Sequence, residues 1–175
     1  SKLLNSARLS EVIEAFTSRV KNEIANIDQI FGPAYKGTIF GSMVGLELKK
    51  LNSKLSLSFD RKEEKDHGEG GLFIGEKPKG RVLIIDDVLS AGTAAKGSID
   101  LIKKEQANPK ILLIGLDRQE KGAGAMLARN ELEQLYDLKV ISVISLDNLI
   151  EFATKDSEFN RWADRLLKYR EEWGS

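Results

Sequence analysis

Two adjacent carboxylates and a short glycine-containing turn stand together in residues 81–94, RVLIIDDVLSAGTA. The apolar run at 82–85 is typical of a strand buried in a parallel sheet. Asp86 and Asp87 follow at the end of that run, where open α/β sheets bind their ligands. Residues 90–94 then begin a helix, so backbone N–H groups and the positive helix end face whatever binds there. The layout fits a hydroxylated sugar held by the carboxylates, with its phosphate at the helix N-terminus. The alternative is an ordinary acidic turn between a strand and a helix.

A second polar segment, residues 60–71 with the sequence DRKEEKDHGEGG, has no apolar residue and ends in glycines. It shows neither a helical nor a strand period, so its composition predicts a surface loop. Arg61, Lys62, Lys65 and the only histidine, His67, lie close together within it. Taken by itself, such a charged run is also typical of a solvated loop without a function.

Both segments resemble parts of one known protein family. Residues 81–94 resemble the signature of the type I phosphoribosyltransferases, which bind 5-phosphoribosyl 1-diphosphate. Residues 60–71 resemble the catalytic loop of the orotate phosphoribosyltransferases in particular. Residues 31–37, FGPAYKG, and 116–122, LDRQEKG, match that family as well. The matches come in the family's order, and the similarity extends over roughly residues 9–174. The sequence is therefore identified as a member of the orotate phosphoribosyltransferases.

The resemblance implies a role for each segment in binding phosphoribosyl diphosphate. Asp86 and Asp87 would hold the ribose hydroxyls and stabilise an oxocarbenium-like ribose, whereas capping of the next helix by Asp87 is the structural alternative. Lys65 would act on the leaving diphosphate, and we expect His67 to contact phosphate rather than act as a general base. The residues expected to contact this substrate are Tyr35, Lys36, Arg61, Lys62, Lys65, His67, Asp86, Asp87, Val88, Leu89, Ser90, Ala91, Gly92, Thr93 and Ala94.

The acceptor, orotate, would lie against Ser90 and Arg118. The planar guanidinium of Arg118 suits a carboxylate, although a surface ion pair with Asp117 or Glu120 is the alternative. The family also implies Mg²⁺, which favours phosphate oxygens and would be bound mainly through the substrate rather than by a metal cage of the protein. It further implies a homodimer in which part of the charged loop serves the neighbouring active site.

Two rival functions share the signature of residues 81–94. One is a phosphoribosyltransferase for another base, and the other is a non-catalytic phosphoribosyl diphosphate-binding regulator of transcription. Regulators of that kind generally lose the catalytic loop, which this sequence retains. Members of the orotate family normally carry a longer base-binding segment before the first helix, which is absent from this sequence, so we expect weaker orotate binding than in a full-length relative.

The pattern of elements predicts an α/β fold formed by a single domain spanning residues 1–175. We expect the type I phosphoribosyltransferase fold, with a five-stranded, mostly parallel sheet covered by helices on both faces. Expected strands are 29–31, 55–59, 82–85, 111–116 and 140–144, and expected helices are 6–26, 36–50, 93–106, 124–136, 146–152 and 157–172.

Bulk properties narrow the class of protein. The 27 basic and 27 acidic residues, with a sequence pI near 6.6, argue against a nucleic-acid partner held by charge. No cysteine is present, which excludes disulfides. Apolar runs are far shorter than the roughly 20 residues that span a bilayer, so we expect a cytoplasmic enzyme without a membrane partner.

Overall fold

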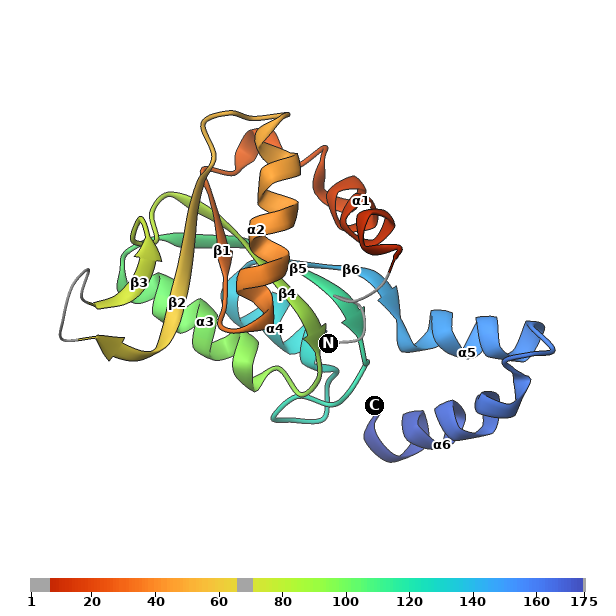
Figure 1. Cartoon of the computed structure of the whole chain (residues 1–175). Coiled ribbons are helices and arrows are strands. Elements are labelled where there is room, and N and C mark those ends of the chain that lie inside the picture. The colour runs from red at the N-terminus through yellow and green to blue at the C-terminus, as the bar shows by residue number, and fades with distance from the viewer. Residues whose placement is uncertain (1–6, 66–70, 175) are drawn as a thin grey trace.

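The computed structural model describes residues 7–65 and 71–174. In this part of the chain, six strands form one sheet with helices on both faces (Figure 1). The strands are β1 (Gln29–Gly32), β2 (Ser56–Lys65), β3 (Gly71–Gly75), β4 (Arg81–Leu89), β5 (Asn108–Asp117) and β6 (Lys139–Ser145). The helices are α1 (Leu9–Val20), α2 (Lys36–Lys49), α3 (Thr93–Lys104), α4 (Ala128–Tyr136), α5 (Leu146–Lys155) and α6 (Ala163–Trp173), with short 3-10 helices η2 (Ile24–Asn26) and η3 (Asn160–Trp162).

The sheet has the order β3-β2-β1-β4-β5-β6, and every neighbouring pair is parallel except β2 and β3. The predicted α/β class and the mostly parallel sheet are confirmed, but the number of strands in the prediction was one too few. The additional strand is β3, an antiparallel edge strand that begins at the last glycine of the charged segment.

The charged segment itself is also more ordered than its composition predicted. Residues 60–65 were predicted as loop, but they continue β2, and Asp60 pairs with Phe73 and Lys65 with Gly71 across the hairpin. Backbone hydrogen bonds hold such a hairpin whatever the side chains. At this edge of the sheet Lys62 and Glu63 are exposed, and Asp60 and Arg61 are partly buried. An entirely polar sequence can therefore form a strand here.

Two apolar cores lie on the two faces of the sheet. Alternate residues of β4 point into one core or the other. Leu83 and Ile85 belong to the core under α1 and α2, and Ile84 belongs to the core under α3 and α4. The rings of Phe16 and Phe40 stack with centroids 5.3 Å apart and join α1 to α2. Continuous apolar strands are thus explained by burial on both faces, as predicted.

Several helices are shorter than their sequence period predicted. The first ends at Val20, and η2 follows after a turn, so the predicted helix to residue 26 is interrupted. The fourth begins at Ala128 rather than at 124, because Gly122 donates a backbone hydrogen bond to Met126 in a loop. At the end of the chain, α5 and α6 form a pair that extends away from the sheet beyond β6 (Figure 1). Among the described helices, none is long and apolar enough to cross a bilayer.

Candidate functional site

The sequence predicted a strand at 82–85, with the two acidic residues after it. In the structure both acidic residues lie within β4, which extends to Leu89. The strand runs on to Leu89 because β5 continues to pair with it, with Asp86 opposite Ile114 and Leu89 opposite Asp117. Successive residues of a strand project to opposite faces. Asp86 and Asp87 therefore start on opposite faces of the strand, but their carboxylates remain close enough to interact.

Asp86, the first of the pair, is partly buried. Its Oδ1 accepts a hydrogen bond of 2.8 Å from the backbone N–H of Asp87. Burial raises the pKa of Asp86 from 3.8 to about 6, and the negative charge of Asp87 adds to this effect. The backbone hydrogen bond opposes the rise but does not cancel it. This carboxyl group is therefore mostly ionised at neutral pH and becomes protonated in mildly acidic solution.

Asp87 is held from the neighbouring layer of helices. The Nζ of Lys36, the first residue of α2, donates a hydrogen bond to a carboxylate oxygen of Asp87. This ion pair joins two residues that were predicted to contact the same substrate. It also argues against the alternative that Asp87 caps α3, because the residue before that helix is Gly92.

Close packing of glycines brings α2 up to the sheet at this point. A Cβ added to Gly32 would collide with the carbonyl oxygen of Gly37, and one added to Gly37 would lie 2.8 Å from the carbonyl oxygen of Ile85. Only residues without a side chain permit this approach. The spacing of these glycines in FGPAYKG therefore places Lys36 beside β4.

Tyr35 completes this corner of the site from the turn between β1 and α2. Its side chain is 69% exposed, and the Nζ of Lys62 lies 4.7 Å from the centre of its ring. The turn is tied to β2 by the carboxylate of Asp60, which accepts a hydrogen bond of 2.5 Å from the N–H of Ala34. Burial raises the pKa of Asp60. Tyr35, Lys36 and Lys62 are thus brought together, as predicted.

The loop after β4 leads into α3 as the sequence predicted. Gly92 has a φ of 85°, a conformation that other residues adopt only with strain, and a Cβ there would meet the Cβ of Ala128 at 3.4 Å. Gly92 also has no side chain that could cap the first N–H groups of α3. Ala91, Thr93 and Ala94 are exposed. The start of this helix therefore presents backbone donors to solvent.

Arg118 lies next to this loop because the strands before them are paired. The N–H of Arg118 donates a hydrogen bond of 2.9 Å to the carbonyl oxygen of Leu89, the residue before Ser90. Its guanidinium Nη2 lies 2.8 Å from Oε1 of Glu120, which is one of the two ion pairs considered as an alternative. The other candidate partner, Asp117, lies 3.5 Å from Nη1 of Arg129.

Parts of the prediction fall on residues that the structure does not describe. His67 lies outside the described residues, and of Lys65 only the backbone at the end of β2 is described. Their roles remain predictions. Within residues 7–65 and 71–174 there is no group of three or more carboxylate or histidine side chains that could hold a metal ion.

Three features of the site gave no usable signal in the sequence. Asp60 was read as part of a charged loop, yet it organises the turn before Lys36. Tyr169 of α6 contacts Arg118 from the far end of the chain. A cleft of about 450 Å³ beside Asp87 is lined by α1, Phe40 and the ends of β5 and β6. Each depends on contacts between distant segments.

Comparison with known proteins supplies the family. Residues 1–146 match the phosphoribosyl transferase domain. The chain is 39% identical to an orotate phosphoribosyltransferase from Thiobacillus denitrificans over 95% of its own length and 79% of that protein. The chain belongs to the orotate phosphoribosyltransferase family. A relative with the same name in Neisseria meningitidis is 44% identical over 84% of this chain and 69% of that protein.

Solved structures of orotate phosphoribosyltransferases agree with this assignment. The crystal structure from Francisella tularensis superposes with a TM-score of 0.76 at 28% identity, covering 97% of this chain and 82% of that one. The structure from Aeropyrum pernix gives a TM-score of 0.66 at 25% identity, covering 89% of this chain and 81% of that one. The predicted family and the predicted phosphoribosyltransferase fold are confirmed.

Proposed function

We propose that this chain transfers the ribose 5-phosphate group of 5-phosphoribosyl 1-diphosphate to orotate, forming orotidine 5′-monophosphate and diphosphate for UMP synthesis. The observation that carries the proposal is the meeting of four segments at one edge of the sheet. They are the Lys36 turn, the Asp86–Asp87 pair, the loop at 90–94 and Arg118. Relatives that match nearly the whole chain are named for this activity.

The first part of the reaction concerns the sugar and its phosphate. The N-terminus of α3 offers backbone N–H groups to the 5′-phosphate, aided by the positive end of the helix. Asp86 and Asp87 accept hydrogen bonds from the ribose hydroxyls and stabilise positive charge that develops on the ring. Lys36 is paired with Asp87, and we expect its cation to face the diphosphate as it departs.

The second part concerns the acceptor. A ring nitrogen of orotate, having released its proton to solvent, forms the new bond to C1 of the ribose as the bond from C1 to the diphosphate oxygen breaks. The electron pair of the broken bond leaves with the diphosphate. Arg118 holds the carboxylate of orotate, and the Ser90 hydroxyl contacts the ring. Lys65 and His67 would add positive charge around the leaving group, and closure over the site would exclude water.

Mg²⁺ is part of the proposal. The neighbouring carboxylates of Asp86 and Asp87 would hold such an ion together with the substrate, since the described residues include no group of three or more carboxylate or histidine side chains that could bind a metal by themselves. Asp86 and Asp87 are the residues that would orient such an ion, directly or through water. The metal would supply neutralisation of the diphosphate charge.

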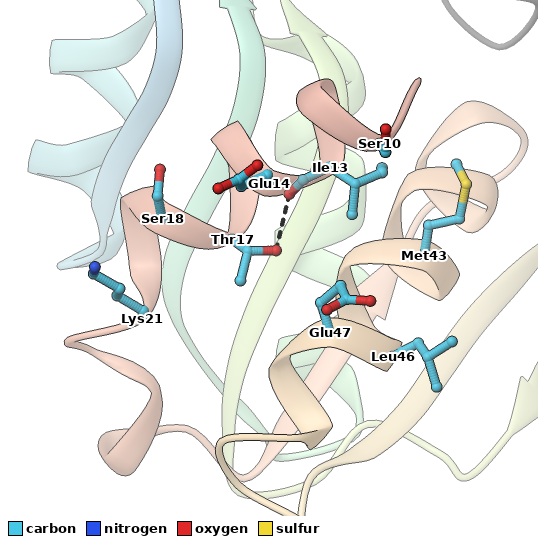
Figure 2. A pocket seen from close by; sticks show the side chains of 9 residues that line it. All are labelled: Ser10, Ile13, Glu14, Thr17, Ser18, Lys21, Met43, Leu46 and Glu47. Atoms are coloured by element: carbon cyan, nitrogen blue, oxygen red, sulfur yellow. Dashed lines mark hydrogen bonds between the residues drawn. The ribbon is translucent and has the colours of Figure 1, made fainter. Parts of the chain in front are cut away.

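We further propose that the enzyme is a cytoplasmic homodimer. Ile39, Leu46 and Leu51 are 41%, 63% and 59% exposed along α2 and the turn that follows it. A pocket of about 660 Å³ lies between α1 and α2. Figure 2 shows Ile13 of α1 and Met43 and Leu46 of α2 among the residues that line it. Polar and charged residues also line this pocket, so the argument for a protein partner rests on the exposed apolar side chains of Ile39, Leu46 and Leu51.

The dimer can be tested by sedimentation and by mixing inactive variants. Leu46→Glu should shift the chain to the monomer. If sites are shared, Lys65→Ala and Asp87→Ala proteins should recover activity when mixed, since some hybrid sites would carry neither substitution. Absence of recovery after confirmed subunit exchange would contradict shared sites.

The activity itself is tested with a panel of acceptors. The chain is incubated with phosphoribosyl diphosphate, Mg²⁺ and either orotate, uracil, adenine or hypoxanthine, and the nucleotide product and diphosphate are measured. We expect product with orotate alone, and none from Asp87→Ala. Turnover with another base but not with orotate would refute the proposed acceptor. Binding of phosphoribosyl diphosphate without turnover of any acceptor would favour a regulator.

A further inference from the structure

Arg118 is held by a side-chain cluster that neither the sequence nor the proposed function assigned. Its Nη2 donates a hydrogen bond to the hydroxyl of Tyr169, and that hydroxyl donates to Oε1 of Glu120. The same Glu120 oxygen lies 2.8 Å from Nη2, so the three groups close a ring of contacts. The guanidinium also lies 5.2 Å from the centre of the Tyr169 ring. One side of Arg118 is therefore fully engaged.

The cluster is fixed from two directions. Glu120 is only 8% exposed; it accepts a hydrogen bond from the Tyr169 hydroxyl and forms an ion pair with Arg118, so its buried charge is compensated. Tyr169 comes from α6, which is itself attached to the Arg118 loop because the N–H of Lys121 donates a 2.9 Å hydrogen bond to the carbonyl oxygen of Trp173. The C-terminal helix thus contacts the loop through both backbone and side chain.

The other nitrogens of the Arg118 guanidinium are available to bind a ligand. Among the described residues, Nε and Nη1 of Arg118 have no hydrogen-bond partner, and its side chain is 40% exposed. A long side chain that is free to rotate loses conformational entropy when it binds an anion. Anchoring Arg118 by one nitrogen lowers that cost and presents its remaining N–H groups in one orientation.

We propose that Tyr169 and Glu120 are positioning residues that orient Arg118 toward the carboxylate of the acceptor, so that α6 takes part in acceptor specificity. The inference rests on the proposed role of Arg118 in orotate binding. The negative charge of Glu120 also acts in the opposite direction, because it weakens the attraction of Arg118 for a second carboxylate. The two effects predict changes of opposite sign, and the experiment below separates them.

Tyr169→Phe is the informative substitution, because it removes the hydroxyl and retains the ring under Arg118. We expect the KM for orotate to rise about tenfold, which corresponds to 1.4 kcal/mol, while the KM for phosphoribosyl diphosphate changes less than about twofold. Tyr136→Phe is the matched control, since the Tyr136 hydroxyl donates to Asp100 at 3.1 Å between α3 and α4. That control should leave both KM values unchanged.

A double-mutant cycle tests whether Tyr169 acts through Arg118. In an Arg118→Ala background, Tyr169→Phe should have no further effect on orotate binding measured by calorimetry. A full additional loss there, or an equal loss for both substrates in the single variant, would overturn the positioning role and indicate a structural one. Glu120→Gln should also raise the KM for orotate, and a fall would show that Glu120 competes with the substrate.

These outcomes are distinguishable from failure of the proposed function. If the unmodified chain neither binds nor converts orotate, the proposed function fails, whatever Tyr169 does. If the unmodified chain is active and Tyr169→Phe matches it in both KM values, the function stands and only the positioning role is refuted. Thermal unfolding of each variant, compared with the Tyr136→Phe control, shows whether the fold is retained.

Discussion

Asp86→Asn should stabilise the protein at neutral pH while lowering its activity. Burial raises the pKa of Asp86 from 3.8 to about 6, so the folded state binds a proton that the unfolded chain has already released between these values. A shift of roughly two units corresponds to about 3 kcal/mol, at 1.36 kcal/mol per unit. This is the cost of ionising Asp86 in the folded protein, and a neutral asparagine avoids it.

The sign of the pH dependence follows from linkage. Below about pH 4 the carboxyl is protonated in both states, and Asp86 contributes no charge penalty. As the pH rises from about 4 to 6, the stability of the unmodified protein falls relative to the variant, and the loss is complete above about 6. Asparagine keeps the oxygen that accepts the 2.8 Å hydrogen bond from the N–H of Asp87, so this local contact survives.

The measurement is urea unfolding followed by circular dichroism at several pH values from about 4 to 7.5. The free energy of unfolding of Asp86→Asn minus that of the unmodified chain should grow from near zero to about 3 kcal/mol across this range. Asp87→Asn is the comparison: it removes the negative charge that adds to the pKa shift of Asp86 but also weakens the pairing with Lys36, so it should give a smaller gain than Asp86→Asn. A difference that does not change with pH would refute the reasoning. Both variants should lose most of their turnover.

Three further predictions concern other parts of the chain. Lys65→Ala should reduce kcat much more than substrate affinity, since we expect the cation at the end of β2 to act mainly on charge that develops in the transition state; near-normal turnover in steady-state kinetics would contradict its role. Gly92→Ala should lower the free energy of unfolding by about 1–2 kcal/mol, because φ is 85° at a position that requires glycine; unchanged denaturant stability would count against it. Leu83→Ala should cost about 2–5 kcal/mol in the same assay, since its side chain is wholly buried, and a loss below 1 kcal/mol would show that the core relaxes.

Local patterns predicted the elements that depend on burial or on special backbone conformations. The apolar runs at 82–85 and 111–116 are buried strands because helices cover both faces of the sheet. Gly32, Gly37 and Gly92 lie where a side chain would collide or where φ is positive. These requirements act on single residues and their neighbours, so they can be read from the sequence.

Pairing between distant segments was harder to predict. Residues 60–65 have no strand period, and only the hairpin with β3 makes them a strand. The continuation of β4 past Asp86 likewise depends on β5, to which it is hydrogen-bonded as far as Leu89. Backbone pairing of this kind does not depend on a particular pattern of side chains, so the pattern of the sequence does not predict it.

The sequence by itself determined the family, the signature strand and the identity of most residues that meet at the site, because those depend on residue type and spacing. Only the tertiary structure decided what each group experiences there. The pKa of Asp86 depends on burial by surrounding segments. The orientation of the Arg118 guanidinium depends on a hydrogen bond to Tyr169, which lies 51 residues further along the chain. Charge, desolvation and hydrogen bonding are set by neighbours in space, and the folded chain alone brings those neighbours together.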